Sequence, residues 1–468
     1  MKGNKVHFIG ICGTAMAPVA VMMRNLGFNV TGSDKGFFPP VSVYLKQNNM
    51  SLLLGYKKEH ITSDIDFVVI GNSQGKDNPE VIEVLSRKIP YYSYPEILKK
   101  YLIKENSIVV AGEFGKTTIT SAIAHILSCS KLEPSFMFGG VPLNFKDACV
   151  SSKGKFSVLE GDEYNSAFFD KKSKFLHYSP KYLVVTGLVW DHVDLFPTKE
   201  EYIQAYKDLV MMLPGDGALF LNSDGQDVIN NLVDIAQCPI YTFSIMRNDT
   251  SFYLESVDLS SDNVARFKLR DNIKKLSYDF ETSLIGMHNI QNIIAAVALS
   301  LTITTISYED IFRAVKSFLG VKRRLEVRYN KNNIMVIDDF AHSPVKIQTA
   351  IQAVRKKFPD RHIISVFEPH TMSARDKKTL NWYSGIFKGS DSVIIADIFK
   401  GNTLSEDTKV NPDDIVNIIK NDVPDSSHIS NVLLADEIKK KMKDGDIFLF
   451  MSSGSFSGAL EKLLRELP

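Results

Sequence analysis

The sequence predicts an α/β protein of three domains, each built around a parallel, doubly wound sheet. Short runs of β-branched and other apolar residues alternate with helical patterns along nearly all of the 468 residues. That alternation is typical of parallel sheets covered by helices on both faces. The length itself allows two to four domains. We place their boundaries at 1–104, 105–320 and 321–468.

Composition excludes several classes of protein. Hydrophobic residues make up 44% of the chain, charged residues 23%, and the formal net charge is +1, so nothing favours a nucleic acid or an anionic membrane as partner. The four cysteines (Cys12, Cys129, Cys149 and Cys238) form no CxxC pair, which argues against a zinc site or a disulfide framework and for a reducing compartment. No apolar run approaches the roughly 20 residues of a membrane span. We expect a cytoplasmic protein that acts on small molecules and does not insert into a membrane.

The N-terminal domain is predicted to be Rossmann-like. Lys5–Ile11 has the pattern of a strand and Thr14–Leu26 that of a helix, and the turn between them contains Gly10 and Gly13. This turn departs from the dinucleotide fingerprint G-x-G-x-x-G, but its glycines still permit a diphosphate to approach the helix N-terminus. Asp34, at the tip of the next strand, is placed to accept hydrogen bonds from a ribose or base. The domain is therefore expected to hold a nucleotide other than NAD, with NAD as the weaker alternative. A further strand is expected at Asp66–Gly71 and a further helix at Glu80–Arg87.

The central domain begins with the most informative stretch of the chain. A β-branched strand, Ser107–Ala111, runs into the turn Gly112–Thr118, and an apolar-periodic helix follows to about Ser130. Such a turn points several backbone N–H groups at one place, where the helix dipole adds partial positive charge. Lys116 supplies a full charge for the β- and γ-phosphates, and the Thr117 hydroxyl is a ligand for Mg²⁺.

Only two residues separate the glycines, where the usual Walker motif has four, so this is a shortened P-loop. The alternative is an ordinary glycine turn. Phosphate binding is favoured because Lys116, Thr117 and Thr118 stand where the chemistry requires them.

Polar residues follow two further strands of this domain. Glu163 comes just after the predicted strand Phe156–Glu160, and His192 just after Tyr182–Leu188. An acidic cluster alone is usually solvated surface, and a single histidine is usually structural. Because the carboxyl ends of parallel strands meet at the ligand-binding edge, we expect Glu163 and His192 to join Thr117 around Mg²⁺. Glu160 is a weaker candidate that would orient these ligands.

The rest of the chain follows the same alternation. Residues 251–286 alternate polar and apolar positions, which predicts a small antiparallel insertion or flank, and an alanine-rich helix starts at Met287. Arg323 and Arg324 follow a domain-ending helix, where paired arginines can clamp a phosphate. A Rossmann-like C-terminal domain is then expected, with strands at Ile334–Ile337, His362–Phe367, Asp391–Ala396 and Asp446–Met451.

Taken together, these motifs resemble those of the Mur ligases, ATP-dependent amide-bond-forming enzymes of peptidoglycan metabolism. The resemblance covers essentially the whole chain. It rests on the stretches GICGTAM, TGSD, GNSQGKDNP, FGGVPLNF, GDEYNSAFFDKKSKFLHY, WDHVDLF, KRRLE, DDFAHSP and FMSSGSFSG.

The resemblance implies how the three domains share the reaction. The N-terminal domain would hold a UDP-sugar, the central domain ATP and Mg²⁺, and a mobile C-terminal domain would close with the amino substrate. A carboxylate would attack the γ-phosphate of ATP, and an amine would then attack the acyl phosphate. The implied catalytic residues are Lys116, Glu163 and His192, and the implied metal ligands are Thr117, Glu163 and His192. The implied ATP-binding residues are Gly112, Gly115, Lys116, Thr117, Thr118, Asn289, Asn292, Arg324 and Asp339, and the UDP-sugar side has Gly10, Gly13, Asp34 and Ser73.

Within the family, two blocks indicate the substrate. AFFDKKSKFLHY (Ala167–Tyr178) and the C-terminal MSSGSFSG resemble the member that joins UDP-N-acetylmuramate to the tripeptide L-alanyl-γ-D-glutamyl-meso-diaminopimelate in peptidoglycan recycling. The alternative is the member that adds L-alanine to the same sugar. An alternative of another class is a UDP-sugar-binding protein without catalysis.

Five positions depart from the family pattern, and two of them, Glu113 and Asn165, motivate the alternative without catalysis. Glu113 and Phe114 replace the Thr-His of the family loop G-T-H-G-K, and Asn165 replaces an aspartate. Ser343 replaces a second histidine. His370 replaces an arginine, which bears on how the acidic groups of a peptide are recognised.

Overall fold

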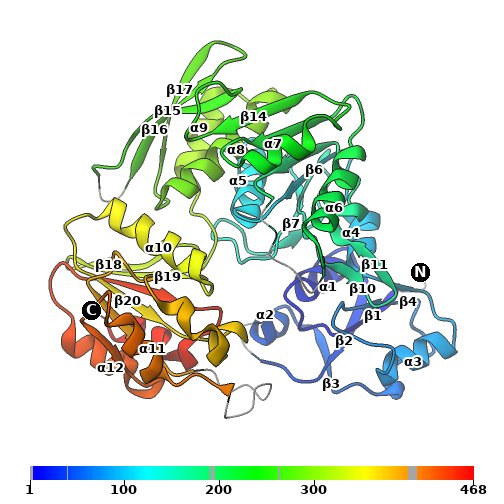
Figure 1. Cartoon of the computed structure of the whole chain (residues 1–468). Coiled ribbons are helices and arrows are strands. Elements are labelled where there is room, and N and C mark those ends of the chain that lie inside the picture. Colours follow the sequence, from blue (N-terminus) through cyan, green and yellow to red (C-terminus); the bar gives the residue numbers. More distant parts are fainter. Residues whose placement is uncertain are drawn as a thin grey trace. The chain divides into compact units, whose positions relative to one another are not determined.

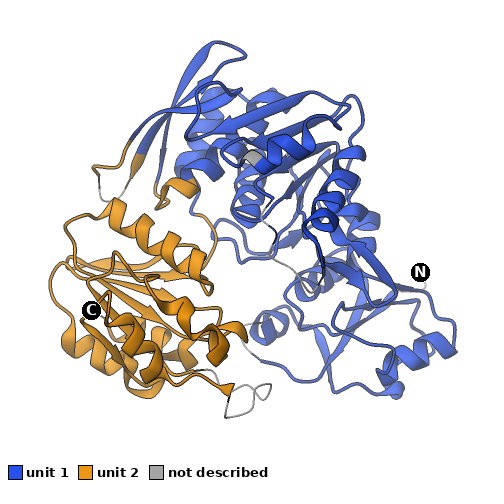
Figure 2. Ribbon diagram, in the orientation of Figure 1, with its two compact units in different colours: residues 1–257, 266–282, 290–319 blue, residues 258–265, 283–289, 320–468 orange. Residues whose placement is uncertain are grey.

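The computed structural model describes residues 4–38, 41–188, 190, 195–261, 264–398 and 408–467. It is a mixed α/β structure with three domains, and its ribbon runs from the N-terminal sheet through the central sheet to the C-terminal sheet (Figure 1). By contacts it separates into two compact units (Figure 2). The first comprises Met1–Val257, Arg266–Thr282 and Ile290–Leu319, and the second comprises Asp258–Ala265, Ser283–Asn289 and Gly320–Pro468.

The N-terminal domain contains a parallel sheet with the strand order β3-β2-β1-β4-β5. β2 and β3 lie on one side of β1, and the later strands β4 and β5 lie on its other side. The strand order therefore reverses between β1 and β4, the point at which such sheets bind ligands. The predicted Rossmann-like domain is thus confirmed. Its strands are β1 (Lys5–Ile9), β2 (Asn29–Asp34), β3 (Ser51–Leu54), β4 (Phe67–Ile70) and β5 (Tyr91–Tyr92), and its helices are α1 (Met16–Asn25), α2 (Val41–Gln47), α3 (Pro79–Ser86) and α4 (Tyr94–Tyr101).

Local chemistry explains where these helices start. Asn78 caps α3 by accepting hydrogen bonds from the backbone of Glu80 and Val81, and Pro79 occupies the first turn. Ser93 and Glu96 form a capping box at the start of α4. The predicted helix at Glu80–Arg87 therefore begins one residue earlier and ends one residue sooner than its apolar pattern indicates.

The central domain has a ten-stranded sheet with the order β17-β16-β15-β14-β13-β12-β6-β9-β7-β8. The P-loop strand β6 lies in its middle, between β12 and β9, and is parallel to both. The strands are β6 (Asn106–Ala111), β7 (Ser135–Met137), β8 (Cys149–Val150), β9 (Phe156–Glu160), β12 (Tyr182–Val185), β13 (Ala218–Asn222), β14 (Ile240–Ser244), β15 (Phe252–Asp258), β16 (Ala265–Asp271) and β17 (Leu276–Thr282). The helices are α5 (Lys116–Cys129), α6 (Lys199–Met211), α7 (Gln226–Leu232), α8 (Met287–Ile303) and α9 (Tyr308–Ser317).

Two parts of the central domain refine the expectations. The region expected as a small insertion or flank supplies β15, β16 and β17, which form one flank of the same sheet. The block after β9 forms a separate two-stranded antiparallel hairpin, β10 (Asn165–Ala167) and β11 (Asp170–Ser173), followed by the 3₁₀ helix η2 (Lys174–His177).

One apolar core joins the N-terminal domain to the central sheet within the first unit. It includes Val19 of α1, Leu98 of α4 and Leu159 of β9, each fully buried. A hydrogen bond from the Tyr44 hydroxyl to Asp147 Oδ1 (2.9 Å) ties α2 to the central domain. The first unit is therefore held together by burial that spans the predicted boundary at residue 104.

The second unit holds a six-stranded sheet with the order β18-β19-β23-β20-β21-β22. The edge strand β18 is antiparallel and the rest are parallel. Along β19, Val336 faces one apolar cluster and Ile337 the other, as the alternation of strand side chains requires. The strands are β18 (Glu326–Lys331), β19 (Ile334–Asp339), β20 (Ile363–Phe367), β21 (Ser392–Ile395), β22 (Ser426–His428) and β23 (Ile447–Met451), with helices α10 (Pro344–Lys357), α11 (Pro412–Ile419), α12 (Asn431–Lys441) and α13 (Ala459–Glu466).

Within the described ranges, every helix is too short or too polar to cross a bilayer. The three sheets fall inside the three expected domains, while the exact domain boundaries stay predictions.

Candidate functional site

The predicted P-loop lies at the carboxyl end of β6, where two glycines have left-handed backbone angles. Gly112 has φ +116° and Gly115, the residue that caps α5, has φ +77°. A side chain on Gly112 would collide with Thr186, and one on Gly115 would collide with the Asn292 amide. Both positions therefore require glycine, and the turn delivers the chain directly into the first turn of α5.

Lys116, the first residue of α5, points at the acidic segment that follows β9. Its Nζ lies 3.2 Å from Oε2 of Glu163, whose side chain is 1% exposed. Burial lowers the pKa of Lys116, but the carboxylates of Glu163, Glu160, Asp162 and Glu113 outweigh it and raise the pKa above its ordinary value. The lysine is therefore a permanent cation, as contact with phosphate requires. Glu113, the unusual residue of the loop, adds to the negative charge around it.

Thr117 is buried, and its hydroxyl is hydrogen-bonded to Glu160, the last residue of β9. Its Oγ1 donates to Glu160, at 2.9 and 3.0 Å from the two carboxylate oxygens, and Glu160 Oε2 also accepts from the backbone N–H of Gly139 at 2.7 Å. A hydroxyl and two carboxylates, those of Glu160 and Glu163, thus gather at the start of α5. Such hard oxygen donors fit Mg²⁺.

The predicted third metal ligand, His192, lies outside the described residues. In the part of the chain that is described, no group of three or more His, Cys, Asp or Glu side chains has the arrangement of a metal site. The metal assignment of Thr117, Glu163 and His192 consequently remains a prediction. Thr118, also predicted to bind ATP, is buried in the first turn of α5.

The two asparagines of α8 have different surroundings. Asn292, in the first unit, is 8% exposed and packs against Gly115 of the P-loop. Asn289, in the second unit, is 2% exposed and donates through Nδ2 to the carbonyl oxygen of Ile285 at 2.8 Å. Only Asn292 is thus brought to the phosphate loop by contacts within one unit.

A polar network that we did not anticipate lies beside the P-loop. Gln291 Nε2 donates to Asn222 Oδ1 (3.1 Å) and Asp224 Oδ2 (2.5 Å), and Asn222 Nδ2 donates to the carbonyl oxygen of Thr186 (2.9 Å). Asn222 ends β13, next to the strand that ends before Thr186. The strand-end rule that selected Glu163, applied to the sequence Leu221-Asn222-Ser223-Asp224, would have found them.

At the N-terminal sheet, the turn after β1 is held tightly to the end of β2. The N–H groups of Gly10 and Ile11 both donate to the carbonyl oxygen of Ser33, at 2.9 and 3.0 Å. Gly10 has φ +82°, and the N–H of Gly13 donates to its carbonyl oxygen at 3.2 Å. The turn is compact and leads into α1, as a diphosphate site needs.

Asp34 has a structural task in this turn. Its Oδ2 accepts a hydrogen bond from the N–H of Cys12 at 2.8 Å, and its Oδ1 accepts from the N–H of Lys35 (2.8 Å) and the hydroxyl of Tyr56 (3.4 Å). Burial, with a smaller contribution from Asp34, raises the pKa of Tyr56 to about 12. The expected role of Asp34 at a ribose or base remains a prediction. The contacts found here show that Asp34 stabilises the glycine turn.

Ser73 and Gly10 are linked by Gln74, which sequence reasoning missed. Gln74 Nε2 donates to Ser73 Oγ at 3.1 Å, and its Oε1 accepts from Asn78 Nδ2 at 3.0 Å. A side chain on Gly10 would meet Gln74. Gly10, Asp34 and Ser73 therefore lie at one edge of the sheet, where its strand order reverses.

In the second unit, Asp339 and Arg324 are neighbours. Asp339 accepts hydrogen bonds from the N–H groups of Leu325 (2.8 Å) and Ala341 (2.7 Å), and burial raises its pKa although Arg324 acts in the opposite direction. The guanidinium of Arg324 lies 5.5 Å from the ring centroid of Phe340. Burial, reinforced by Arg324, lowers the pKa of His288 to about 4, so this imidazole is neutral near pH 7.

His370, which stands where the family has arginine, contacts the C-terminal turn. Its Nδ1 lies 3.1 Å from Ser453 Oγ, and Glu368 accepts from Ser452 Oγ (2.7 Å) and the N–H of Phe456 (3.1 Å).

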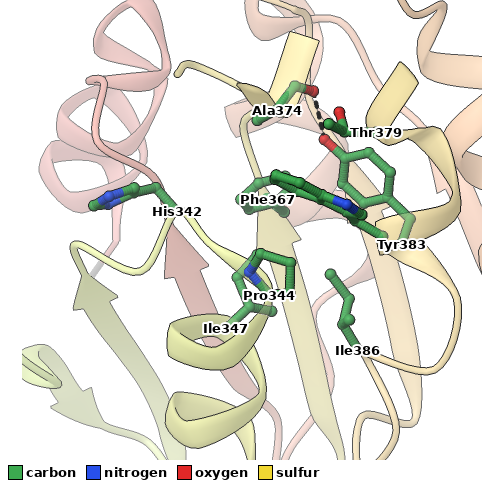
Figure 3. A pocket seen from close by; sticks show the side chains of 9 residues that line it. His342, Pro344, Ile347, Phe367, Ala374, Thr379, Tyr383 and Ile386 are labelled. Carbon is green, nitrogen blue, oxygen red and sulfur yellow. Dashed lines mark hydrogen bonds between the residues drawn. The ribbon is translucent and has the colours of Figure 1, made fainter. Parts of the chain in front are cut away.

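The second unit also contains a small apolar pocket of about 250 Å³, part of which is open to solvent (Figure 3). The Tyr383 hydroxyl at its wall donates to the carbonyl oxygen of Ala374 at 2.6 Å. The lining residues are His342, Pro344, Ile347, Phe367, Ala374, Thr379, Trp382, Tyr383 and Ile386.

Three family models match the chain. They are described as the Mur ligase family catalytic domain, matching residues 5–105, the Mur ligase middle domain, matching 110–300, and the Mur ligase glutamate ligase domain, matching 323–454.

Individual relatives are similar along their whole length. The UDP-N-acetylmuramate–L-alanyl-γ-D-glutamyl-meso-2,6-diaminoheptandioate ligase of Escherichia coli is 33% identical, covering 98% of this chain and 97% of its own. The UDP-N-acetylmuramate–L-alanine ligase of Brachyspira hyodysenteriae is 31% identical, covering 100% and 98%. Among solved structures, a murein peptide ligase of Psychrobacter arcticus has a TM-score of 0.70 at 28% identity and covers 100% of both chains.

Proposed function

The chain belongs to the Mur ligase family, ATP-dependent ligases that form C–N bonds, and on that premise we propose that it is a murein peptide ligase. The proposed reaction joins the lactyl carboxylate of UDP-N-acetylmuramate to the amine of L-alanyl-γ-D-glutamyl-meso-diaminopimelate, with ATP and Mg²⁺. Both nucleotides are cytoplasmic metabolites, so the proposed location is the cytoplasm.

The observation that carries the proposal is the P-loop with its acidic partner segment. A permanent cation at Lys116 and the oxygens of Thr117, Glu160 and Glu163 gather where α5 begins. The tripeptide is favoured by the block Ala167–Tyr178 and by a relative and a solved structure named for that activity. Relatives named for L-alanine are similarly close, so L-alanine is the second candidate.

The residues of the P-loop and the acidic segment are suited to phosphoryl transfer. Lys116 would exchange its contact with Glu163 for the γ-phosphate and neutralise charge that develops as phosphate is transferred. Thr117, Glu163 and the predicted ligand His192 would hold Mg²⁺, with Glu160 fixing the Thr117 hydroxyl. When bound, the metal supplies further positive charge at the phosphates. Backbone N–H groups of the turn between Gly112 and Lys116 would orient the phosphate chain.

The bond changes balance without another reactant. A lactyl carboxylate oxygen bonds to the γ-phosphorus and ADP leaves. The amine then attacks the carbonyl carbon, the C–O bond to phosphate breaks, and the nitrogen loses a proton as the amide forms. Inorganic phosphate departs with one former carboxylate oxygen. We propose that Arg324 and Asp339, in the second unit, also bind ATP, and that the protein excludes water from the acyl phosphate.

This route predicts transfer of isotope from carboxylate to phosphate. UDP-N-acetylmuramate labelled with ¹⁸O in its lactyl carboxylate should yield phosphate carrying one ¹⁸O per turnover, read by mass spectrometry of the released phosphate. Unlabelled phosphate released at the same rate would mean that water attacks ATP, and would contradict the ligase proposal.

A further inference from the structure

Lys174 and the residue after it bind the chain on both sides of Glu163. The proposed reaction gives Lys174 no role. The N–H of Phe175 donates to the carbonyl oxygen of Asp162 (3.2 Å), and the N–H of Lys174 donates to that of Tyr164 (2.9 Å). The Lys174 Nζ lies 2.6 Å from Asp162 Oδ2. These three contacts fix Asp162 and Tyr164, the residues immediately before and after Glu163.

The ammonium of Lys174 is held in a largely buried aromatic site. Its side chain is 10% exposed, and Nζ lies 5.5 Å from the ring centroid of Tyr94 and 5.4 Å from that of Tyr164. Tyr94 belongs to α4, the last helix of the N-terminal domain. A largely buried cation between two rings and a carboxylate is held in one place, because moving away would give up the ion pair and both ring contacts.

The hairpin between Tyr164 and Lys174 has a second anchor on the N-terminal domain. Phe168 and Phe169, at its turn, pack against the apolar cluster on that domain's sheet, and the Phe169 ring lies 4.9 Å from that of Tyr91. All of these residues belong to the first unit. The hairpin therefore leaves the acidic segment, anchors on the neighbouring domain, and returns with Lys174.

We propose that Lys174 is a positioning residue that fixes the Glu163 carboxylate for the metal–nucleotide site. It acts through Asp162 and Tyr164 and touches neither phosphate nor metal. This inference rests on the proposed function, which assigns Glu163 to that site. Partners that orient a metal ligand are typically worth 10- to 100-fold in metal affinity.

The test uses the full-length protein and Mn²⁺ binding measured by electron paramagnetic resonance in the presence of the non-hydrolysable β,γ-imido analogue of ATP. Lys174→Met keeps the apolar stem and removes the charge, and should weaken Mn²⁺ binding about tenfold or more. Lys174→Arg should recover most of the lost affinity. Lys172→Met, which changes an exposed lysine of the same hairpin, is the matched control and should bind as the unaltered protein does.

Binding of UDP-N-acetylmuramate, measured by calorimetry, separates positioning from general damage and should be the same in all variants. Wild-type Mn²⁺ affinity in Lys174→Met, or an equal loss of sugar binding, would overturn the inference while leaving the proposed function in place. Failure of the unaltered protein to bind the Mn²⁺–nucleotide would overturn both. If Lys174→Met does not fold, Asp162→Asn removes the same ion pair by neutralising the carboxylate. It should likewise weaken Mn²⁺ binding and leave UDP-sugar binding unchanged, and the same contrary results would overturn the inference.

Discussion

Lys116→Ala should lower kcat for the ligase reaction on the order of 10³-fold and leave the binding of UDP-N-acetylmuramate unchanged. Its Nζ is the cation that α5 places at the P-loop, 3.2 Å from Glu163. The residues proposed to bind the UDP-sugar lie at the edge of a different sheet. Initial rates of phosphate release and calorimetric titration with the UDP-sugar measure the two effects.

The control for this variant is Lys153→Ala, which removes an exposed lysine of the same unit and should keep the full rate. A further effect is expected in stability. Loss of the lysine leaves Glu163 buried without its cation, so thermal unfolding should occur at lower temperature. If Lys116→Ala retained a near-normal rate, the shortened turn would not be a phosphate loop.

Gly115→Ala should weaken nucleotide binding on the order of 10²-fold and destabilise the first unit by roughly 1–3 kcal/mol. The added methyl group meets two obstacles, a backbone angle φ of +77° and the amide of Asn292. To relieve the clash, either α5 must start differently or Asn292 must move. Either change displaces the backbone N–H groups that we propose bind the phosphates. Titration with the ATP analogue and thermal denaturation measure the two losses.

Gly225→Ala is the matched control, because Gly225 also precedes a helix but has φ −99°, and a Cβ there would make only an ordinary contact with Val228 Cγ2 at 3.8 Å. It should change neither quantity beyond twofold in affinity. A Gly115→Ala protein with unaltered nucleotide affinity would show that the loop geometry is not used for binding.

The fold followed from the sequence where strands were long and apolar. The runs at Lys5–Ile11, Ser107–Ala111 and Asp446–Met451 each became a buried parallel strand, because burial on both faces selects continuous apolar residues. The edge strands β5 and β18 were missed. β5 is only two residues long, and β18 (Glu326–Lys331) contains the charged residues Glu326, Arg328 and Lys331, so neither has the apolar run of a buried strand.

The site followed from the sequence where its chemistry is local, as in the P-loop, or where it follows a predicted strand, as for Glu163. Lys116 and Thr117 were predicted because a glycine turn and a helix N-terminus lie beside each other in the chain. The contacts of Gln74 with Gly10, of Gln291 with Asn222 and of Lys174 with Tyr94 join residues distant in sequence, and only tertiary structure brings them together. Asp34 illustrates the same limit, since its position was predicted and its hydrogen bond to Cys12 was not.

The central claim is that the tripeptide is the amine substrate, and a competition experiment tests it most directly. The protein is incubated with MgATP, UDP-N-acetylmuramate and equal concentrations of L-alanyl-γ-D-glutamyl-meso-diaminopimelate and L-alanine, and the products are identified by mass spectrometry. The account predicts UDP-N-acetylmuramoyl-tripeptide as the dominant product, with phosphate release that stops when the tripeptide is omitted. A dominant UDP-N-acetylmuramoyl-L-alanine product would contradict it in favour of the L-alanine ligase, and absence of both products with intact UDP-sugar binding would contradict catalysis itself.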